Sequence, residues 1–119
     1  MRYLFLCYPN CSTCKKARMW LDDHQIDYEF RDIKQDNPNY DELAKWIELS
    51  KLPIRKFFNT SGQSYRLLSV KDHLEELPTR QIIELLANDG MLVKRPLLIS
   101  KEVVLVGFNA EAWASQLLK

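Results

Sequence analysis

Hydrophobic and polar positions follow two periods along this chain, and the change between them predicts the order of its secondary structure. The apolar run 3–7 is short, rich in β-forming residues and followed closely by a proline, as in a buried strand. Segment 17–21 spaces apolar groups as a helix does, whereas 28–33 alternates apolar and charged residues like a half-solvated strand. These three elements form a βαβ unit, so we expect parallel strands and a right-handed crossover.

The middle of the chain, from about residue 39 to 89, carries helical spacing and no alternating strand pattern. We expect Gly90, after Asp89, to end this stretch in the left-handed conformation that glycine adopts easily. The helices expected there cover 39 or 40 to 50, 54–58, 70–77 and 78–88, and Pro53 stands at the start of the second.

The last quarter of the chain returns to a strand pattern. The apolar runs 97–100 and 103–106 are joined by two polar residues, which predicts a hairpin, and Asn109 is placed to cap a final helix over 110–118. The whole order is βαβ, helices, then ββα. It predicts a single α/β domain over 1–119, with a helical insertion at about 39–89.

Composition narrows the class of protein. At 119 residues, with 46% hydrophobic and 28% charged residues, the chain has the makeup of an ordinary globular domain. A formal net charge of +1 argues against direct nucleic-acid binding and against an anionic membrane surface as partner. The N-terminus lacks the features of a signal peptide, and three cysteines, an odd number, do not make a secreted disulfide framework. We therefore expect a cytoplasmic protein.

The candidate chemistry lies where the first strand turns into the first helix, at the Cys-x-x-Cys of Cys11 and Cys14. The unpartnered N–H groups at a helix start favour a thiolate, and the two lysines after Cys14 add to the same field. We expect Cys11 to be the attacking thiolate and Cys14, one turn further in, to resolve the intermediate. Ser12 and Thr13 are placed to cap the first turn or to bind an anion.

Two other interpretations of these cysteines remain open. Cys-x-x-Cys can be half of a zinc site, although zinc needs about four ligands and no other cysteine or histidine shows ligand spacing. The pair can also be a coincidence within a helix. Cys7, at the end of the first strand, is expected to be an inert core residue.

The element order with Cys-x-x-Cys at the first helix is that of a thioredoxin-like fold. In that fold a proline opens the third strand opposite the cysteine helix, and Pro96 fills this place. We expect the Arg95–Pro96 peptide bond to be cis, against the general preference for trans. Arg95 would then lie opposite Cys11, where its guanidinium can stabilise the thiolate and hold an oxyanion. A solvated or surface-paired arginine is the alternative.

With these residues in view, the chain resembles the arsenate reductase-like (ArsC) family, including its Spx/MgsR and YffB branches. The resemblance covers essentially the full length, and its motifs are specific only in combination. They are Pro9-Asn10-Cys11-x-x-Cys14-Lys15-Lys16-Ala17-Arg18-x-Trp20-Leu21, Phe57-Phe58-Asn59-Thr60-Ser61-Gly62, and Asp89-Gly90-Met91-Leu92-Val93-Lys94-Arg95-Pro96-Leu97.

The resemblance implies a catalytic set of Cys11, Cys14 and Arg95, with Arg55 loosely matching a second arginine of the family. The loop after Phe58 could bind an anion or could only turn the chain. The expected substrate-binding set is Asn10, Ser12, Thr13, Arg55, Asn59 and Pro96. Two positions depart from the arsenate reductases, because Tyr8 replaces a histidine and the last hairpin lacks an arginine. The anion clamp that arsenate needs is therefore incomplete.

The resemblance leaves two functions open. One is a thiol-dependent oxidoreductase that acts on a small thiol or an oxyanion, holds no bound cofactor and is recycled by glutathione or thioredoxin. The other is a redox switch of the Spx type that binds the RNA polymerase alpha subunit. The segment that Spx would use corresponds to Ser50-Lys51-Leu52-Pro53 and contains no glycine, which favours the oxidoreductase.

Overall fold

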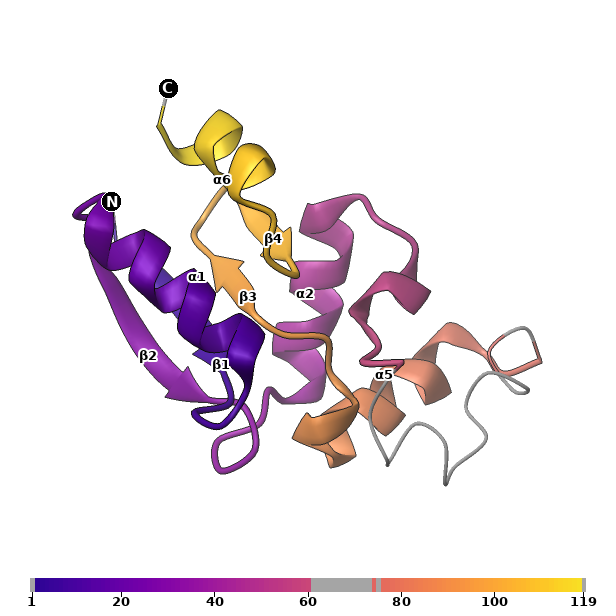
Figure 1. Cartoon of the computed structure of the whole chain (residues 1–119). Coiled ribbons are helices and arrows are strands. Elements are labelled where there is room, and N and C mark those ends of the chain that lie inside the picture. Colours follow the sequence, from indigo (N-terminus) through magenta and orange to yellow (C-terminus); the bar gives the residue numbers. More distant parts are fainter. Residues whose placement is uncertain (1, 61–73, 75, 119) are drawn as a thin grey trace. The chain divides into compact units, whose positions relative to one another are not determined.

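The computed structural model describes residues 2–60, 74 and 76–118 (Figure 1). These residues fall into two compact units. The first joins the N-terminal residues up to 32 with the C-terminal residues from 95 onward, and the second comprises 33–94. Each unit is described by itself below.

A four-stranded sheet forms the centre of the first unit. Its strand order is β2-β1-β3-β4, with β1 and β2 parallel and with β3 antiparallel to both of its neighbours. The chain order of the elements and the parallel pairing of β1 and β2 are as predicted, so the α/β thioredoxin-like fold class is confirmed. The elements of this unit are β1 (Tyr3–Cys7), α1 (Ser12–Asp23), β2 (Tyr28–Asp32), β3 (Leu97–Ile99), β4 (Val104–Val106) and α6 (Ala110–Leu117).

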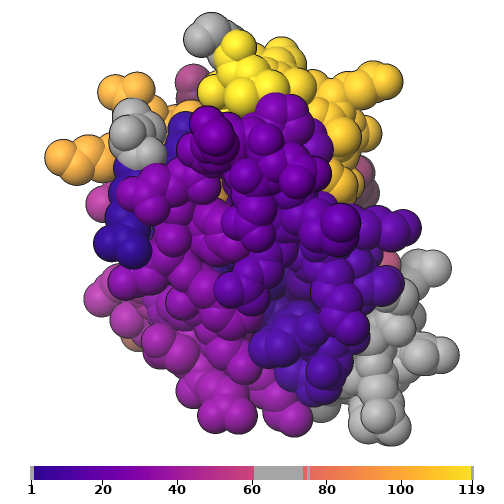
Figure 2. All heavy atoms as spheres, turned by 60° about the vertical axis from the view of Figure 1, so that its left-hand side comes forward, coloured from indigo at the N-terminus to yellow at the C-terminus, as the bar shows by residue number. Residues whose placement is uncertain are grey.

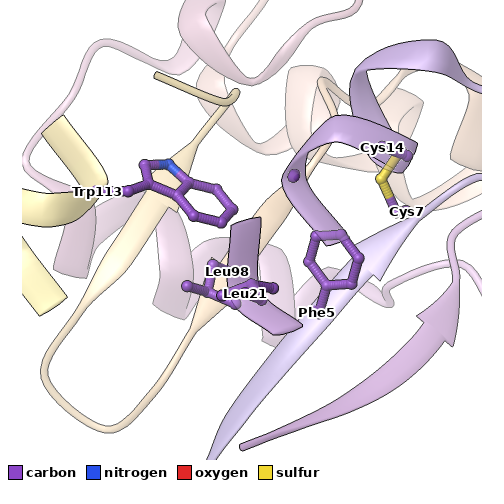
Figure 3. Packing of buried hydrophobic residues seen from close by; sticks show 7 residues of the cluster. Phe5, Cys7, Cys14, Leu21, Leu98 and Trp113 are labelled. Atoms are coloured by element: carbon purple, nitrogen blue, oxygen red, sulfur yellow. A yellow bond between two sulfur atoms is a disulfide. The ribbon is translucent and has the colours of Figure 1, made fainter. Parts of the chain in front are cut away.

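One face of this sheet packs against α1 and α6, and the packing follows from the two periods in the sequence. Phe5 and Cys7 lie two apart on β1 and therefore share a face. Residues at helical spacing turn the buried side of α1 toward that face. Figure 3 shows the cluster, with the Cys7–Cys14 pair at one end and Trp113 at the other. Its buried members are Phe5, Cys7, Cys14, Ala17, Leu21, Leu98 and Trp113.

Trp113 anchors α6 to the same layer. Its indole Nε1 donates to the Gly107 carbonyl oxygen at 3.1 Å, and its ring makes edge-to-face contacts with Trp20 and Phe108. Asn109 caps the helix as predicted, its side chain accepting from the Ala112 N–H at 3.0 Å. In Figure 2 the yellow atoms of the C-terminal segment border the purple atoms of the N-terminal one.

The second unit holds the predicted helical stretch. Asn39 and Glu42 form a reciprocal capping box at the start of its first helix, which explains why the sequence begins a helix there. The predicted helix over 70–77 lies largely outside the described residues. The described elements are α2 (Tyr40–Ser50), η1 (Ile54–Phe57), α5 (Thr79–Asn88) and η2 (Gly90–Leu92), the two η elements being 3₁₀ helices.

The predicted role of Gly90 is wrong. Gly90 has no left-handed φ and does not end α5 in that way, because it begins η2 instead. A Cβ on Gly90 would lie 1.8 Å from the Ile33 carbonyl oxygen and 2.9 Å from the Asn37 Cβ. The position therefore needs glycine because another backbone segment passes close to it.

Candidate functional site

Cys11 is the N-cap residue of α1. Its backbone is extended, with φ −86° and ψ 126°, and its carbonyl accepts from the Lys15 N–H at 3.1 Å to close the first turn. The Cys11 N–H donates to the Tyr8 carbonyl oxygen at 3.0 Å, and this bond closes the turn before the helix. The predicted placement of Cys11 at the helix start is confirmed, and its thiol is partly exposed and not in a disulfide.

Several groups act on the Cys11 sulfur in opposite directions. Burial by itself raises the pKa of this thiol, but the backbone N–H groups of Cys14 and Thr13 lower it, as do the hydrogen bond and the charge of Arg95. The lowering groups prevail, so the pKa of Cys11 lies below its ordinary value. The Cys11 thiol makes no side-chain capping bond, and the N–H groups at the start of α1 favour its thiolate form.

Arg95 contacts Cys11 from the segment that leads into β3. The Arg95–Pro96 peptide bond is cis, as predicted, and Pro96 leads directly into β3. The Arg95 guanidinium hydrogen-bonds to Cys11, and its Cζ lies 5.7 Å from the centre of the Tyr8 ring. The predicted position of Arg95 opposite Cys11 is confirmed.

Cys14 pairs with a different cysteine from the one the sequence suggested. The structure joins Cys14 to Cys7 in a disulfide, with Cα atoms 5.8 Å apart, instead of pairing it with Cys11 (Figure 3). Cys14 and Cys7 are 4% and 0% exposed. The Tyr8 N–H also donates to the Cys14 sulfur at 3.3 Å.

The expectation that Cys7 is an inert core residue is therefore wrong in this structure, although its burial was predicted. The signal for the pairing was present in the sequence. Cys7 shares the strand face of Phe5, and Cys14 shares the helix side of Ala17 and Leu21. Where these two faces meet, the two buried sulfurs meet, while Cys11 at the helix end stays at the surface.

The remaining predicted binding residues divide between the two units. Asn10, Ser12 and Thr13 are exposed around Cys11, and the Asn10 side chain donates to the Tyr8 hydroxyl at 3.5 Å. Arg55 and Asn59 belong to the second unit. There Arg55 is exposed on η1, and Asn59 is held through its N–H to the Leu92 carbonyl at 2.7 Å.

Because Arg55 and Asn59 belong to the second unit and Cys11 belongs to the first, their substrate-binding role stays a prediction. Ser61 and Gly62 of the same predicted loop lie outside the described residues. Over residues 2–60, 74 and 76–118, no three His, Cys, Asp or Glu side chains are grouped as metal ligands. Within the same ranges no helix is long and apolar enough to cross a membrane.

Comparison with known proteins assigns the chain to a family. The sequence profile of the ArsC family matches residues 6–116. The chain belongs to the ArsC family. It is a small thiol redox protein with three cysteines close together in the first unit.

Two relatives are similar over nearly the whole chain. The uncharacterized protein YusI of Bacillus subtilis (strain 168) is 43% identical over 96% of this chain and 100% of its own. The regulatory protein MgsR of the same organism is 30% identical over 88% of this chain and 82% of its own.

A solved structure extends the likeness to the fold. An ArsC family related protein from Bacteroides fragilis is 50% identical, with a TM-score of 0.93 over 97% of both chains. The element order and the sheet described above are therefore those of the family.

Proposed function

We propose that the protein is a thiol–disulfide oxidoreductase in which Cys11 is the nucleophile. The observation that supports this most directly is the position of the partly exposed Cys11 thiol at the N-cap of α1, where helix N–H groups and Arg95 lower its pKa. A thiolate, and not a thiol, attacks a disulfide, so a cysteine with a lowered pKa offers more of the reactive form than an ordinary cysteine does.

The first step is an exchange at Cys11. Its thiolate attacks one sulfur of a small-molecule disulfide, the sulfur–sulfur bond of the substrate breaks, and one substrate thiolate leaves. Cys11 is left in a mixed disulfide with the other half of the substrate. Arg95 stabilises the attacking thiolate by hydrogen bond and charge, and Asn10, Ser12 and Thr13 are the side chains beside it that would contact substrate.

The second step returns Cys11 to its thiolate. When Cys14 is in its reduced form, its sulfur attacks the Cys11 sulfur of the mixed disulfide, and the second substrate thiolate leaves. Glutathione or thioredoxin then supplies the two electrons that reduce the resulting protein disulfide and release the Cys11 thiolate. Such a cycle suits the reducing conditions of the cytoplasm. An oxyanion held by the Arg95 fork is a second substrate class, and the same assay run with arsenate and glutathione tests it.

The test is turnover of a glutathione mixed disulfide by the purified full chain, coupled to glutathione reductase. Cys11→Ser should reduce turnover about 100-fold or more, because the attacking atom is lost. A matched control is Glu111→Gln, an exposed charge change on α6, which should leave turnover unchanged. If Cys11→Ser turns over substrate like the unaltered chain, the proposal fails.

A redox-responsive regulator is the second candidate, and the likeness to MgsR, a regulatory protein, favours it. In this role a change in the cysteine pairing would alter the surface offered to the RNA polymerase alpha subunit. Binding of the reduced and the oxidised chain to purified alpha subunit tests this directly. Equal affinity of the two forms, or no binding by either, would exclude the regulator.

A further inference from the structure

Cys14 lies between the two other cysteines of the chain. Cys11 is three residues before it, at the start of the same helix turn, and Cys7 is bonded to it from the end of β1. All three belong to the first unit, and all three pack in or against its apolar cluster. Cys14 can therefore exchange partners between a surface sulfur and a core sulfur without leaving its place in α1.

We propose that Cys7, Cys14 and Cys11 form a relay in which the bond received at Cys11 is passed through Cys14 to Cys7. The buried Cys7–Cys14 disulfide is then the resting oxidised form, and Cys11 becomes free again. This inference rests on the proposed function, because the relay begins with the mixed disulfide at Cys11.

The relay consists of two thiol–disulfide exchanges, and atoms and electrons balance in each. The Cys14 thiolate attacks the Cys11 sulfur of the mixed disulfide, the substrate thiolate leaves, and a Cys11–Cys14 disulfide forms. The Cys7 sulfur then attacks the Cys14 sulfur, releases its proton to solvent, and expels the Cys11 thiolate. Over the whole sequence one substrate disulfide is reduced to two thiols, and the Cys7/Cys14 dithiol is oxidised to a disulfide.

The leaving group gives this relay its direction. Exchange favours expulsion of the thiolate with the lowest pKa. Among the three sulfurs, Cys11 has the hydrogen bond and charge of Arg95 and two helix N–H groups to stabilise it. Cys7 is fully buried at the end of β1, where a thiolate is costly and a disulfide is not.

Burial of Cys7 and Cys14 also determines how their disulfide is reduced. Cys7 is 0% exposed and Cys14 is 4% exposed, so a molecule as large as glutathione cannot reach either sulfur directly. Reduction must then begin with attack of Cys11 on Cys14, which is the last step of the relay reversed. Cys11 is accordingly required both to form the core disulfide and to open it.

The experiment follows disulfide connectivity in the full chain during oxidation by glutathione disulfide. Trypsin leaves all three cysteines in the peptide 3–15, since no Lys or Arg lies between Arg2 and Lys15. Free thiols are therefore blocked with one alkylating reagent at each time point. The disulfides are then reduced, labelled with a second reagent, and the two labels are located by fragmentation of that peptide.

We expect the oxidised wild-type chain to carry the second label on Cys7 and Cys14, with Cys11 free or bonded to glutathione. In Cys11→Ser the Cys7–Cys14 disulfide should form and be reduced at least about 100-fold more slowly, because the sulfur that begins both exchanges is missing. In Cys7→Ala the oxidised chain should accumulate with a Cys11–Cys14 disulfide.

Urea unfolding of the reduced Cys7→Ala and Cys7→Ser chains shows whether either substitution affects folding.

Two results would overturn the relay. One is a wild-type oxidised form that is Cys11–Cys14 with Cys7 free. The other is formation of Cys7–Cys14 at the same rate in Cys11→Ser as in wild type. Failure of the relay is distinguishable from failure of the proposed function, since turnover can still depend on Cys11 when the connectivity excludes Cys7.

Discussion

The Arg95 guanidinium hydrogen-bonds to Cys11, and so links the residue before the cis proline to the N-cap of α1. Two residues far apart in the sequence are thereby brought together within the first unit. The Arg95 guanidinium adds to the backbone N–H groups of Cys14 and Thr13, and together they lower the pKa of a thiol that burial alone would keep protonated.

Replacing Arg95 by glutamine should raise the pKa of Cys11 and slow its reaction with iodoacetamide at pH 6. A hydrogen bond to a charged group contributes about 1.5 kcal/mol, so the expected loss is roughly tenfold. The assay uses the oxidised chain, in which Cys11 is the free cysteine. The control is Arg18→Gln, an exposed arginine of α1 that lies over the Phe30 ring. If both variants slow equally, the effect comes from net charge and not from the contact.

The lowered pKa of Cys11 also predicts how stability depends on pH. Between the folded pKa of Cys11 and its unfolded value of about 8.5, the unfolded chain binds more protons than the folded chain. The free energy of unfolding contributed by this thiolate is therefore fully present above the unfolded pKa. It is lost as pH falls through the folded pKa.

Urea unfolding of the reduced wild type and of Cys11→Ser, from pH 6 to pH 9, measures this contribution. The difference between the two proteins should grow in favour of the wild type as pH rises. Cys7 and Cys14 are present in both proteins, so their contributions to the free energy of unfolding cancel in the comparison. A difference that stays constant with pH would mean that Cys11 has the same pKa folded and unfolded.

Gly90→Ala should destabilise the chain by about 1–3 kcal/mol, the usual cost of forcing extra volume into a packed site. Its Cβ would overlap the Ile33 carbonyl oxygen, so backbone has to move and not only a side chain. Urea unfolding gives the value. Asn88→Ala, at an exposed position of α5 two residues earlier, is the control and should change stability by less than about 0.5 kcal/mol. Equal effects would show that the close approach at Gly90 is absent.

The sequence predicted those parts of the fold that depend on local periodicity. The strand ending at Cys7, the helix beginning after Cys11 and the capped helix after Asn109 each follow from a few neighbouring residues, and each is confirmed. The cis bond before Pro96 and the position of Arg95 needed the fold as well, because they depend on which strand lies opposite α1.

The features that the sequence did not predict depend on contacts between distant segments. The partner of Cys14 depends on which face of β1 meets which side of α1, and spacing alone favoured Cys11. The need for glycine at position 90 depends on the approach of Ile33. The description of the chain as one domain with an insertion, and the roles of Arg55 and Asn59, stay predictions.

The Tyr8 ring lies beside Arg95, with its centre 5.7 Å from the guanidinium carbon. A cation–π contact of this kind contributes about 0.5–1 kcal/mol at a partly exposed site. Tyr8→Ala should therefore slow alkylation of Cys11 at pH 6 by roughly twofold to fivefold, because Arg95 loses the surface that orients it. Tyr8→Phe keeps the ring but removes the hydroxyl to which Asn10 donates, and it should react like the wild type. If Tyr8→Phe slows the reaction as much as Tyr8→Ala does, the hydroxyl and not the ring positions Arg95.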